Sequence, residues 1–466
     1  MPIASVNPAT GERLRTFEPP TARALDALVA RAADAFGRWR RTPVAERAAV
    51  VRRAGEILER DRARFARLMT LEMGKTLRAA EEEAAKCAAG CRYYADHAER
   101  LMAPAPVEGA GADEYVAYEP LGVVLAVMPW NFPFWQVIRF AAPALVAGNV
   151  GLLKHASNVP QCALALERLF LDAGAPEGAF TALLVGSDAV AGLLADPRVA
   201  AATLTGSEPA GRQVGATAGR ELKKTVLELG GSDPFVVMPS ADVARAAAVA
   251  VKARAINNGQ SCIAAKRFVV HERVYDDFRE RFVAGVRALR VGDPAEADTD
   301  VGPLATRAIR DELVEQVQRS VALGATLLVG GHAMDGPGNF FAPAVLESLP
   351  PSAPVAREET FGPVAALFRV ASEAEAVRVA NDTTFGLGAS VWTTDREEAR
   401  RFAQALEAGQ VFVNGMVVSD PRFPFGGVKH SGYGRELGAF GLREFVNVKT
   451  VRMVFDGGAG AGAETE

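Results

Sequence analysis

The sequence predicts an α/β protein with two doubly wound domains, and three observations support this fold class. The chain has 466 residues, more than the roughly 250–300 residues at which one hydrophobic core usually stops growing. Residues 21–101 show helical periodicity, and from Leu121 onward short apolar runs alternate with helical segments. Such alternation predicts parallel sheets with helices on both faces.

The expected elements begin with helices. Thr42 and Pro43 have the pattern of an N-cap and a first-turn proline, followed by one long amphipathic helical run that reaches Met73 and Gly74. The first strands are expected at residues 122–128, 150–154, 182–186 and 201–205, each followed by a helical segment.

A second cycle of strands and helices is expected from Val226 onward. It contains a strand at 235–238, a helix at 241–255, a strand at 266–271, and further alternation as far as a strand at 411–414. The extended pattern at residues 450–454 predicts an edge strand that a second subunit can cover.

Composition argues against several classes of function. The net charge of -4 and the pI near 5.9 provide no general positive field for nucleic acid. The most apolar stretch, residues 132–153, contains Arg139 near its middle, which argues against a membrane span. Only four cysteines and no signal-peptide pattern indicate a cytoplasmic protein with reduced thiols.

Two residues indicate covalent catalysis. Cys262 ends the polar, glycine-containing run 256–262, and Glu228 stands among apolar neighbours in the run 226–231. A thiolate can attack a carbonyl carbon, and a carboxylate in a partly apolar setting can take a proton from water. The alternatives are a buried structural cysteine and an ion-paired glutamate.

Metal chemistry is not expected. Cys87 and Cys91 lie four positions apart, but no histidine or third cysteine has matching spacing.

Four sequence blocks resemble the signature motifs of the aldehyde dehydrogenase superfamily. They are PWNFP at 129–133, LELGG at 227–231, NGQSC at 258–262 and EETFGP at 358–363. Within that superfamily, the blocks at 153–160, 231–235 and 425–432 are similar to those of NAD(P)-dependent succinate-semialdehyde dehydrogenases. The resemblance spans nearly the whole chain.

The resemblance implies a domain organisation and an assembly. A Rossmann-like cofactor-binding domain is expected at 1–117 and 139–227, a Rossmann-like catalytic domain at 228–425, and small β segments for oligomerisation or bridging at 118–138 and 440–456. A homodimer or homotetramer is expected, without nucleic-acid or membrane partners.

The implied reaction oxidises an aldehyde to a carboxylic acid through a Cys262 thiohemiacetal and a thioester. In this reading Glu228 activates the hydrolytic water, and Asn131 donates its amide, with the backbone N–H of Cys262, to the oxyanion. Succinate semialdehyde is the favoured substrate, with another semialdehyde or small aldehyde as the alternative. A different class, a non-redox thioester hydrolase or acyl-transferase, also fits the thiol and the carboxylate.

The cofactor residues implied by the resemblance lie in several blocks. Gly206 and Ser207 join a strand to a helix through small residues, which can offer backbone N–H groups to a pyrophosphate. Ser157 stands where NAD-selective relatives often have glutamate. Lys154 and Ser157 therefore favour NADP as the cofactor, and NAD is the second candidate. The alternative role for Ser157 is to cap the helix that begins near Pro160. The remaining candidates are Trp130, Glu359 and Phe361.

The expected substrate residues follow the oxyanion asparagine. Trp135 and Arg139 are four positions apart on a predicted helix and can face one tunnel. Arg139 among apolar neighbours needs an anion, either a substrate carboxylate or a structural Asp or Glu. Ser261 and Ser419 are additional candidate donors to the carboxylate.

Overall fold

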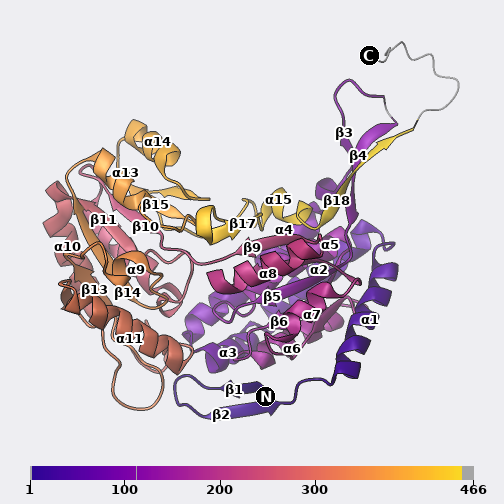
Figure 1. Ribbon diagram of the computed structural model, residues 1–466, viewed down its shortest axis with the longest axis horizontal. Helices are drawn as coiled ribbons and strands as arrows, with labels where there is room; N and C mark the ends of the chain where they lie inside the picture. Colours follow the sequence, from indigo (N-terminus) through magenta and orange to yellow (C-terminus); the bar gives the residue numbers. More distant parts are fainter. Residues whose placement is uncertain (1–2, 112, 454–466) are drawn as a thin grey trace.

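The computed structural model describes residues 3–111 and 113–453, which form two lobes and a projecting narrow sheet (Figure 1). The chain opens with a hairpin, β1 (Ile3–Val6) and β2 (Arg13–Phe17). Four helices follow: α1 (Ala22–Trp39), α2 (Val44–Arg60), α3 (Arg62–Met73) and α4 (Leu77–Met102).

The helical lead-in is confirmed, with two corrections. Pro43, and not Thr42, occupies the N-cap position of α2, because the Thr42 hydroxyl bonds backward to the Arg38 carbonyl. The expected single run is two helices, since Asp61 leaves helical geometry at φ -98° and ψ 18°. Arg60 and Arg64 donate to its carboxylate, and a short acidic side chain favours such a helix boundary.

The first lobe contains a six-stranded sheet in the order β17-β9-β8-β5-β6-β7. Its parallel strands are β5 (Val123–Met128), β6 (Val150–His155), β7 (Phe180–Ala182), β8 (Val199–Thr205) and β9 (Lys224–Glu228). β17 (Gly432–Tyr433) pairs antiparallel with β9 and places Gly432 opposite Glu228. The intervening helices are α5 (Trp135–Ala147), α6 (Pro160–Asp172), α7 (Ala189–Ala195) and α8 (Glu208–Arg220).

One expected strand of this sheet is displaced. The strand predicted at 182–186 is β7 at Phe180–Ala182. Beyond it the backbone turns, because the Val185 N–H bonds the carbonyl of Leu183 instead of a neighbouring strand.

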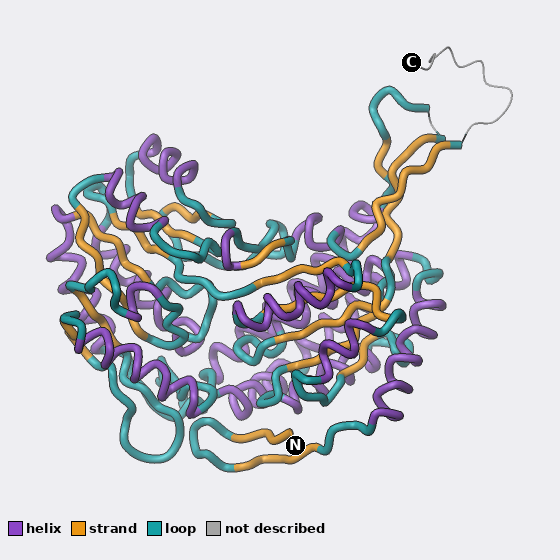
Figure 2. The backbone as a smooth tube through the Cα atoms, in the orientation of Figure 1, coloured by secondary structure: helices purple, strands orange, loops and turns teal. Residues whose placement is uncertain are grey.

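The second lobe contains a seven-stranded sheet in the order β12-β13-β14-β11-β10-β15-β16. Figure 2 shows the strands of this lobe lying between helices. Its strands are β10 (Pro234–Val237), β11 (Arg267–His271), β12 (Thr326–Val329), β13 (Ala344–Glu347), β14 (Val364–Val370), β15 (Ala389–Trp392) and β16 (Val411–Val413). Only β12 runs antiparallel to its neighbour within this sheet. Its helices are α9 (Val243–Ala255), α10 (Glu272–Arg287), α11 (Arg307–Ala322), α12 (Pro354–Arg357), α13 (Glu373–Asn381) and α14 (Arg396–Ala405).

Alternate residues of this sheet pack on opposite faces. Phe235 and Phe268 join one hydrophobic cluster, whereas Val236 and Val269 join another. Because both faces are covered, the strands are apolar at nearly every position. The doubly wound α/β fold class is thus confirmed.

The projecting sheet has the order β18-β4-β3 and is antiparallel. It consists of β3 (Ala105–Pro106), β4 (Glu114–Pro120) and β18 (Val446–Arg452), which follows α15 (Gly438–Arg443). The edge strand expected at 450–454 lies at 446–452 instead, and residues 454–456 lie outside the described residues.

The expected bridging segment 118–138 contains a strand of the first lobe. Within the range 118–138, β5 is an inner strand of the six-stranded sheet, because its apolar side chains are covered on both sides. Only residues up to Pro120 pair with β18.

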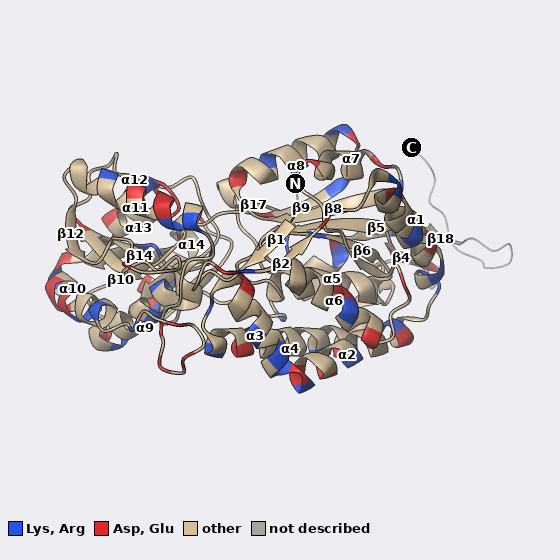
Figure 3. Ribbon diagram, turned by 90° about the horizontal axis from the view of Figure 1, so that it is seen from below, with Lys and Arg blue, Asp and Glu red and all other residues tan. Residues whose placement is uncertain are grey.

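Figure 3 shows acidic and basic residues interspersed along the outer helices. None of the helices within residues 3–111 and 113–453 combines the length and apolar character needed to cross a bilayer. The same residues contain no group of three or more His, Cys, Asp or Glu side chains arranged to hold a metal ion.

Trp392 tests the packing of the second sheet. It is 1% exposed and stacks on Phe235 with ring centroids 5.6 Å apart. We expect Trp392→Ala to lower the free energy of unfolding by about 3–5 kcal/mol, because the truncation leaves a cavity. Urea denaturation followed by circular dichroism measures this change.

The matched control is Phe423→Ala, since Phe423 is 63% exposed. Its effect should stay within about 0.5 kcal/mol. Equal losses for the two variants would contradict the packing assignment.

Candidate active site

Cys262 is carried by a loop with unusual backbone geometry. After α9, the short 3-10 turn η1 (Ile256–Gly259) places Asn257 at φ 55° and Asn258 at φ 58°. Asparagine tolerates this left-handed conformation better than most residues. The Asn257 amide donates to the carbonyl oxygens of Asn131 and Gln260 at 2.8 and 3.0 Å. The turn is thereby bonded to the first lobe.

Gly259 is required in this turn by both conformation and space. Its φ is 73°, and a Cβ atom there would lie 2.4 Å from the carbonyl carbon of Gly362. The buried guanidinium of Arg254 donates to the Gly259 carbonyl at 2.6 Å. The residues before Cys262 are therefore held from both sides.

The Cys262 side chain is buried, with 9% exposure. Burial raises the pKa of its thiol to about 12, while Arg139 and Lys266 act in the opposite direction. The Lys266 ammonium donates to the carbonyl oxygens of Ser261 and Cys262 at 2.9 and 2.7 Å. In the free protein the thiol is therefore protonated at neutral pH.

Two cavities meet at Cys262. A cavity of about 510 Å³ lies toward α8 and contains Asn131 in its lining. A second cavity, of about 200 Å³, lies between α4, α5 and the loop that contains Ser419. Cys262 and Gln136 line both cavities, so the sulfur stands where molecules in the two spaces would meet.

Asn131 lies against the cysteine loop, as expected. Its side-chain amide donates to the carbonyl of Gln260 at 3.1 Å. An amide group has two N–H donors, so one remains for a second acceptor.

Glu228 lies deeper in the protein than expected. It is 2% exposed, and neither carboxylate oxygen has a hydrogen-bond partner. A Cβ atom on Gly426 would lie 2.6 Å from its Oε1 atom, so the absence of a side chain there makes room for the carboxyl group. Among the described residues, the linings of the two cavities do not include Glu228.

The surroundings of Glu228 favour its neutral form. Burial raises its pKa well above the ordinary value, and the neighbouring Glu436 raises it further, while Arg139 and Arg435 oppose the shift. The structure therefore brings Asn131 and Cys262 to one cavity and leaves the Glu228 carboxyl group behind it, beside Glu436.

Buried Arg139 has an anionic partner within the protein. It lines the smaller cavity, but its guanidinium forms an ion pair with Glu436 and donates to Thr205 at 3.2 Å. Its charge also lies over the Phe425 ring, 4.7 Å from the centroid. The structure therefore contains the structural salt bridge that was one of the two expected alternatives. Its acidic partner, Glu436, comes from a distant part of the chain.

The other expected substrate residues do line the smaller cavity. The Trp135 indole donates to Ser419 Oγ at 3.0 Å, and Ser261 Oγ is buried without a partner. Sequence reasoning missed Lys86, whose ammonium donates to Ser419 Oγ at 2.6 Å. The available signal was a lysine within the alanine-rich helical run at 84–89.

Five of the expected cofactor residues line the larger cavity: Trp130, Gly206, Ser207, Glu359 and Phe361. The rings of Trp130 and Phe361 pack edge to face, with their centroids 5.6 Å apart.

Glu359 is fixed by two partners. It accepts from the Gly231 N–H at 3.0 Å and pairs with the buried Lys266 at 3.3 Å. Through Glu359, Lys266 therefore connects the larger cavity with the cysteine loop, a contact that sequence reasoning missed.

The remaining two cofactor candidates lie outside that cavity. Lys154 stands near the end of β6 with 8% exposure, and burial lowers its pKa. Ser157 lines a separate depression of about 730 Å³, together with Gly186 and the first residues of β1. Ser157 does not cap α6, because Val159 occupies that N-cap position.

The protein offers groups that fit a dinucleotide. Gly206 and Ser207 precede α8, and the Ser207 side chain makes no capping bond to that helix. A Cβ atom on Gly230, in the lining of the same cavity, would lie 2.4 Å from Glu359 Oε2. A helix N-terminus, a close-packed glycine and a nearby carboxylate suit a pyrophosphate and ribose hydroxyls.

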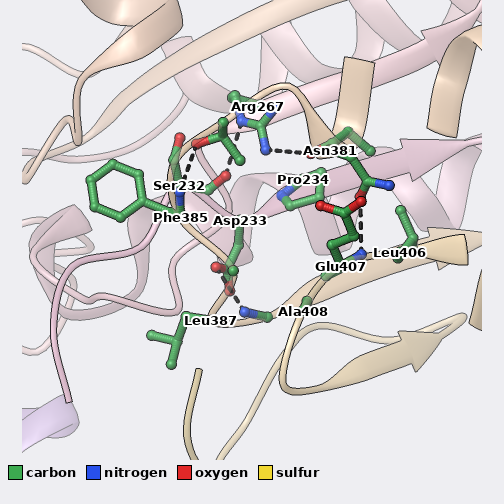
Figure 4. Close-up of a pocket in the computed structure, with 15 residues that line it drawn as sticks. Ser232, Asp233, Pro234, Arg267, Asn381, Phe385, Leu387, Leu406, Glu407 and Ala408 are labelled. Carbon is green, nitrogen blue, oxygen red and sulfur yellow. Dashed lines mark hydrogen bonds between the residues drawn. The ribbon is translucent and has the colours of Figure 1, made fainter. Parts of the chain in front are cut away.

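The segment between Glu228 and β10 is anchored in the second lobe (Figure 4). The carboxylate of Asp233 accepts from the Gly388 N–H at 3.0 Å, and Arg267 donates to the Ser232 carbonyl at 2.9 Å. Burial raises the Asp233 pKa to about 7. These bonds fix the chain where it crosses from one sheet to the other.

The geometry defines a class of protein. The buried Cys262 thiol lies at the junction of two cavities, beside an asparagine amide and a helix N-terminus. Residues 1–451 match the family model described as Aldehyde dehydrogenase family, which agrees with this geometry. The chain belongs to the aldehyde dehydrogenase family. The resemblance read from the sequence motifs is confirmed.

Individual relatives are similar over nearly their full length. The succinate-semialdehyde dehydrogenase (NADP(+)) 1 of Mycobacterium tuberculosis is 59% identical over 454 residues, covering 97% of this chain and 99% of the relative. The succinate-semialdehyde dehydrogenase (NADP(+)) of Mycobacterium avium is 56% identical over 472 residues, covering 100% of both chains.

A solved structure is also similar to this chain. The succinic semialdehyde dehydrogenase of Streptococcus pyogenes in complex with NADP+ has a TM-score of 0.95 and 38% identity, covering 97% of this chain and 99% of that chain.

The raised thiol pKa has a measurable consequence. Because only the thiolate reacts, alkylation of Cys262 by iodoacetamide in the free protein should accelerate by roughly tenfold per pH unit from about pH 7 to 10. The slope follows from a pKa of about 12, so no plateau is expected in that range. Mass spectrometry of the Cys262 peptide measures the rate.

A plateau near pH 8–9 would contradict this prediction, since it would indicate an ordinary thiol. The other cysteines, Cys87, Cys91 and Cys162, are fully buried and serve as internal controls of low reactivity.

Proposed function

We propose that this protein oxidises succinate semialdehyde to succinate with NADP+, and that Cys262 is the nucleophile. The observation that carries the proposal is the position of Cys262 in the lining of both cavities. The names of the similar mycobacterial and streptococcal proteins support the substrate and the cofactor.

In the proposed first step, the Cys262 thiolate attacks the aldehyde carbon. The free N–H of the Asn131 amide and the backbone N–H of Cys262 donate to the oxyanion that forms. NADP+, when bound, supplies the acceptor for the hydride that leaves this carbon. The product on the enzyme is a Cys262 thioester.

In the second step, Glu228 takes a proton from the water that attacks the thioester, which releases the carboxylic acid and the thiolate. Glu228 must first turn from Gly426 toward the cavities. Because its carboxyl oxygens have no hydrogen-bond partner, that rotation breaks no side-chain hydrogen bond. Its raised pKa also strengthens it as a base once ionised.

The choice of NADP over NAD rests on Lys154 and Ser157. We propose that the ammonium and the hydroxyl bind the 2'-phosphate, since neither places a negative charge there. NAD lacks that phosphate and is expected to be used less well.

The assembly and location are part of the proposal. The outer edge of β18 has no partner strand within residues 3–111 and 113–453, and Val448 on it is 61% exposed. We propose a homodimer or homotetramer that covers this edge, in the cytoplasm. The proposed domains keep the expected ranges, with 228–425 as the catalytic domain, except that β5 (Val123–Met128) belongs to the sheet of the cofactor-binding domain.

Comparing substrates and cofactors tests the function. Turnover of succinate semialdehyde and of butanal, each with NADP+ and NAD+, is followed by the absorbance of the reduced cofactor. We expect the highest kcat/KM for succinate semialdehyde with NADP+, and no turnover after Cys262→Ala. Full turnover by Cys262→Ala, or equal use of the two aldehydes, would overturn the proposal.

Asn131→Ala tests the oxyanion donor. Losing one such donor should lower kcat by about 100-fold to 1,000-fold, because the bond strengthens in the transition state. Steady-state kinetics with succinate semialdehyde measure the loss, and titration with NADP+ shows whether cofactor affinity is retained. A kcat within about threefold of the unmodified enzyme would exclude this role.

A further inference from the structure

Lys266 contacts the cysteine loop and a carboxylate of the larger cavity at the same time. The residue immediately precedes β11, and its ammonium donates to the carbonyl oxygens of Ser261 and Cys262 at 2.9 and 2.7 Å. The ammonium also lies 3.3 Å from Glu359 Oε1. Because Glu359 lines the larger cavity, one side chain joins the backbone of Cys262 to the wall of that cavity.

The contacts of Lys266 favour its charged form. Its side chain is 1% exposed, and burial lowers its pKa, whereas Glu359 acts in the opposite direction. A charged lysine has three N–H donors and no acceptor, and here three oxygen atoms face the nitrogen. A neutral amine would turn its lone pair toward one of these oxygens, so the arrangement suits the ammonium ion.

The backbone of Lys266 is held independently of its side chain. Its N–H donates to the Asp233 carbonyl at 3.1 Å, and its carbonyl accepts from the Ala366 N–H of β14 at 2.9 Å. Replacing the side chain leaves both backbone bonds in place. Variants at position 266 therefore test the charge and not the strand.

The two charges of the ion pair differ in their exposure to solvent. The Glu359 side chain is 20% exposed, against 1% for Lys266. Water therefore screens the carboxylate more than the ammonium, and the positive charge acts more strongly on the neighbouring sulfur. The pKa of Cys262 follows the same order: burial raises it, and Lys266 lowers it more than Glu359 raises it.

Arg139 is the other cation that favours the Cys262 thiolate, but its setting is different. It lines the smaller cavity and is already paired with Glu436. Lys266 lines neither cavity, as far as the described residues 3–111 and 113–453 show. Lys266 therefore acts through Cys262 and Glu359 and not by touching a ligand.

We propose that Lys266 is a positioning residue that favours the thiolate of Cys262 by holding a buried positive charge against the Cys262 carbonyl, and that Glu359 opposes this effect. The inference deepens the proposed function, since it concerns the reactivity of the proposed nucleophile. Its test needs neither substrate nor cofactor, because the charge acts in the free protein.

The test measures alkylation of Cys262 by iodoacetamide at about pH 8, followed by mass spectrometry of the Cys262 peptide. Lys266→Met should slow the reaction by roughly threefold to tenfold, because loss of a nearby cation raises the thiol pKa. The greater nucleophilicity of a thiolate with a higher pKa offsets part of this loss. Glu359→Gln should accelerate the reaction by roughly twofold to fivefold, because it removes the opposing charge.

The opposite signs separate an electrostatic role from a purely structural one. Losing the bonds to two loop carbonyls would loosen the loop and expose the buried sulfur, which speeds alkylation. Alkylation of Lys266→Met at or above the rate of the unmodified protein would therefore overturn the proposal. Slower alkylation of Glu359→Gln would overturn it as well.

A second background keeps the test decisive if Lys266→Met does not fold, since that variant leaves a carboxylate without its partner. In the Glu359→Gln protein, the added change Lys266→Met removes the cation and leaves no unpaired charge in its place. It should again slow alkylation by roughly threefold to tenfold relative to Glu359→Gln alone. Equal rates in this pair would show that Lys266 has no electrostatic role.

Two control variants complete the set, and circular dichroism shows that each protein is folded. Lys266→Arg retains the charge and should alkylate faster than Lys266→Met. Lys252→Met is the matched control, since Lys252 is an exposed lysine on α9, and it should leave the rate unchanged. The other charged groups near Lys266, which are Arg254 and Asp233, are the same in every variant and cannot cause the differences.

Turnover separates this inference from the proposed function. An unmodified enzyme that does not oxidise succinate semialdehyde with NADP+ overturns the proposed function and leaves the order of the alkylation rates intact. An active enzyme whose variants alkylate in the wrong order retains the function and overturns the role of Lys266.

Discussion

The left-handed turn at residues 257–259 is the constraint on which the active site depends. Its backbone directs the chain from the end of α9 to Cys262 at the boundary of the two lobes. Asn257 bonds the carbonyl of Asn131, and Asn258 bonds that of Gly74 at 2.9 Å, so the turn connects the second lobe to the first. The same bonds thus fix the position of Cys262 and join the two lobes.

Desolvation is the largest cause of the pKa shifts in the site. It raises the pKa of Cys262 to about 12 and the pKa of Glu228 well above its ordinary value, so burial favours the neutral form of both acids in the free protein. Cations oppose this at defined points, since Lys266 bonds the Cys262 carbonyl and Arg139 lies beside Glu436. A ligand that brings charge into either cavity is expected to change the ionisation of Cys262.

Much of the fold was predictable, because its strands carry strong local signals. The apolar run of β5 lies within one residue of its expected start, and Gly74 ends α3 in the left-handed conformation typical of a helix C-terminus. The misses have local causes that compete with periodicity. At Asp61 a polar side chain interrupts a helical pattern, and after Ala182 the backbone bonds to itself and leaves the sheet.

The sequence by itself determined the fold class, the family and the candidates Cys262, Asn131 and Glu228, because these depend on local periodicity and on short contiguous motifs. Only the tertiary structure decided which partner each buried charge has. Arg139 meets Glu436, and Lys86 meets Ser419, from segments far apart along the chain. A buried charge is stabilised by whichever opposite charge or dipole the fold brings within a few ångströms, and that proximity is a property of packing that no linear spacing encodes.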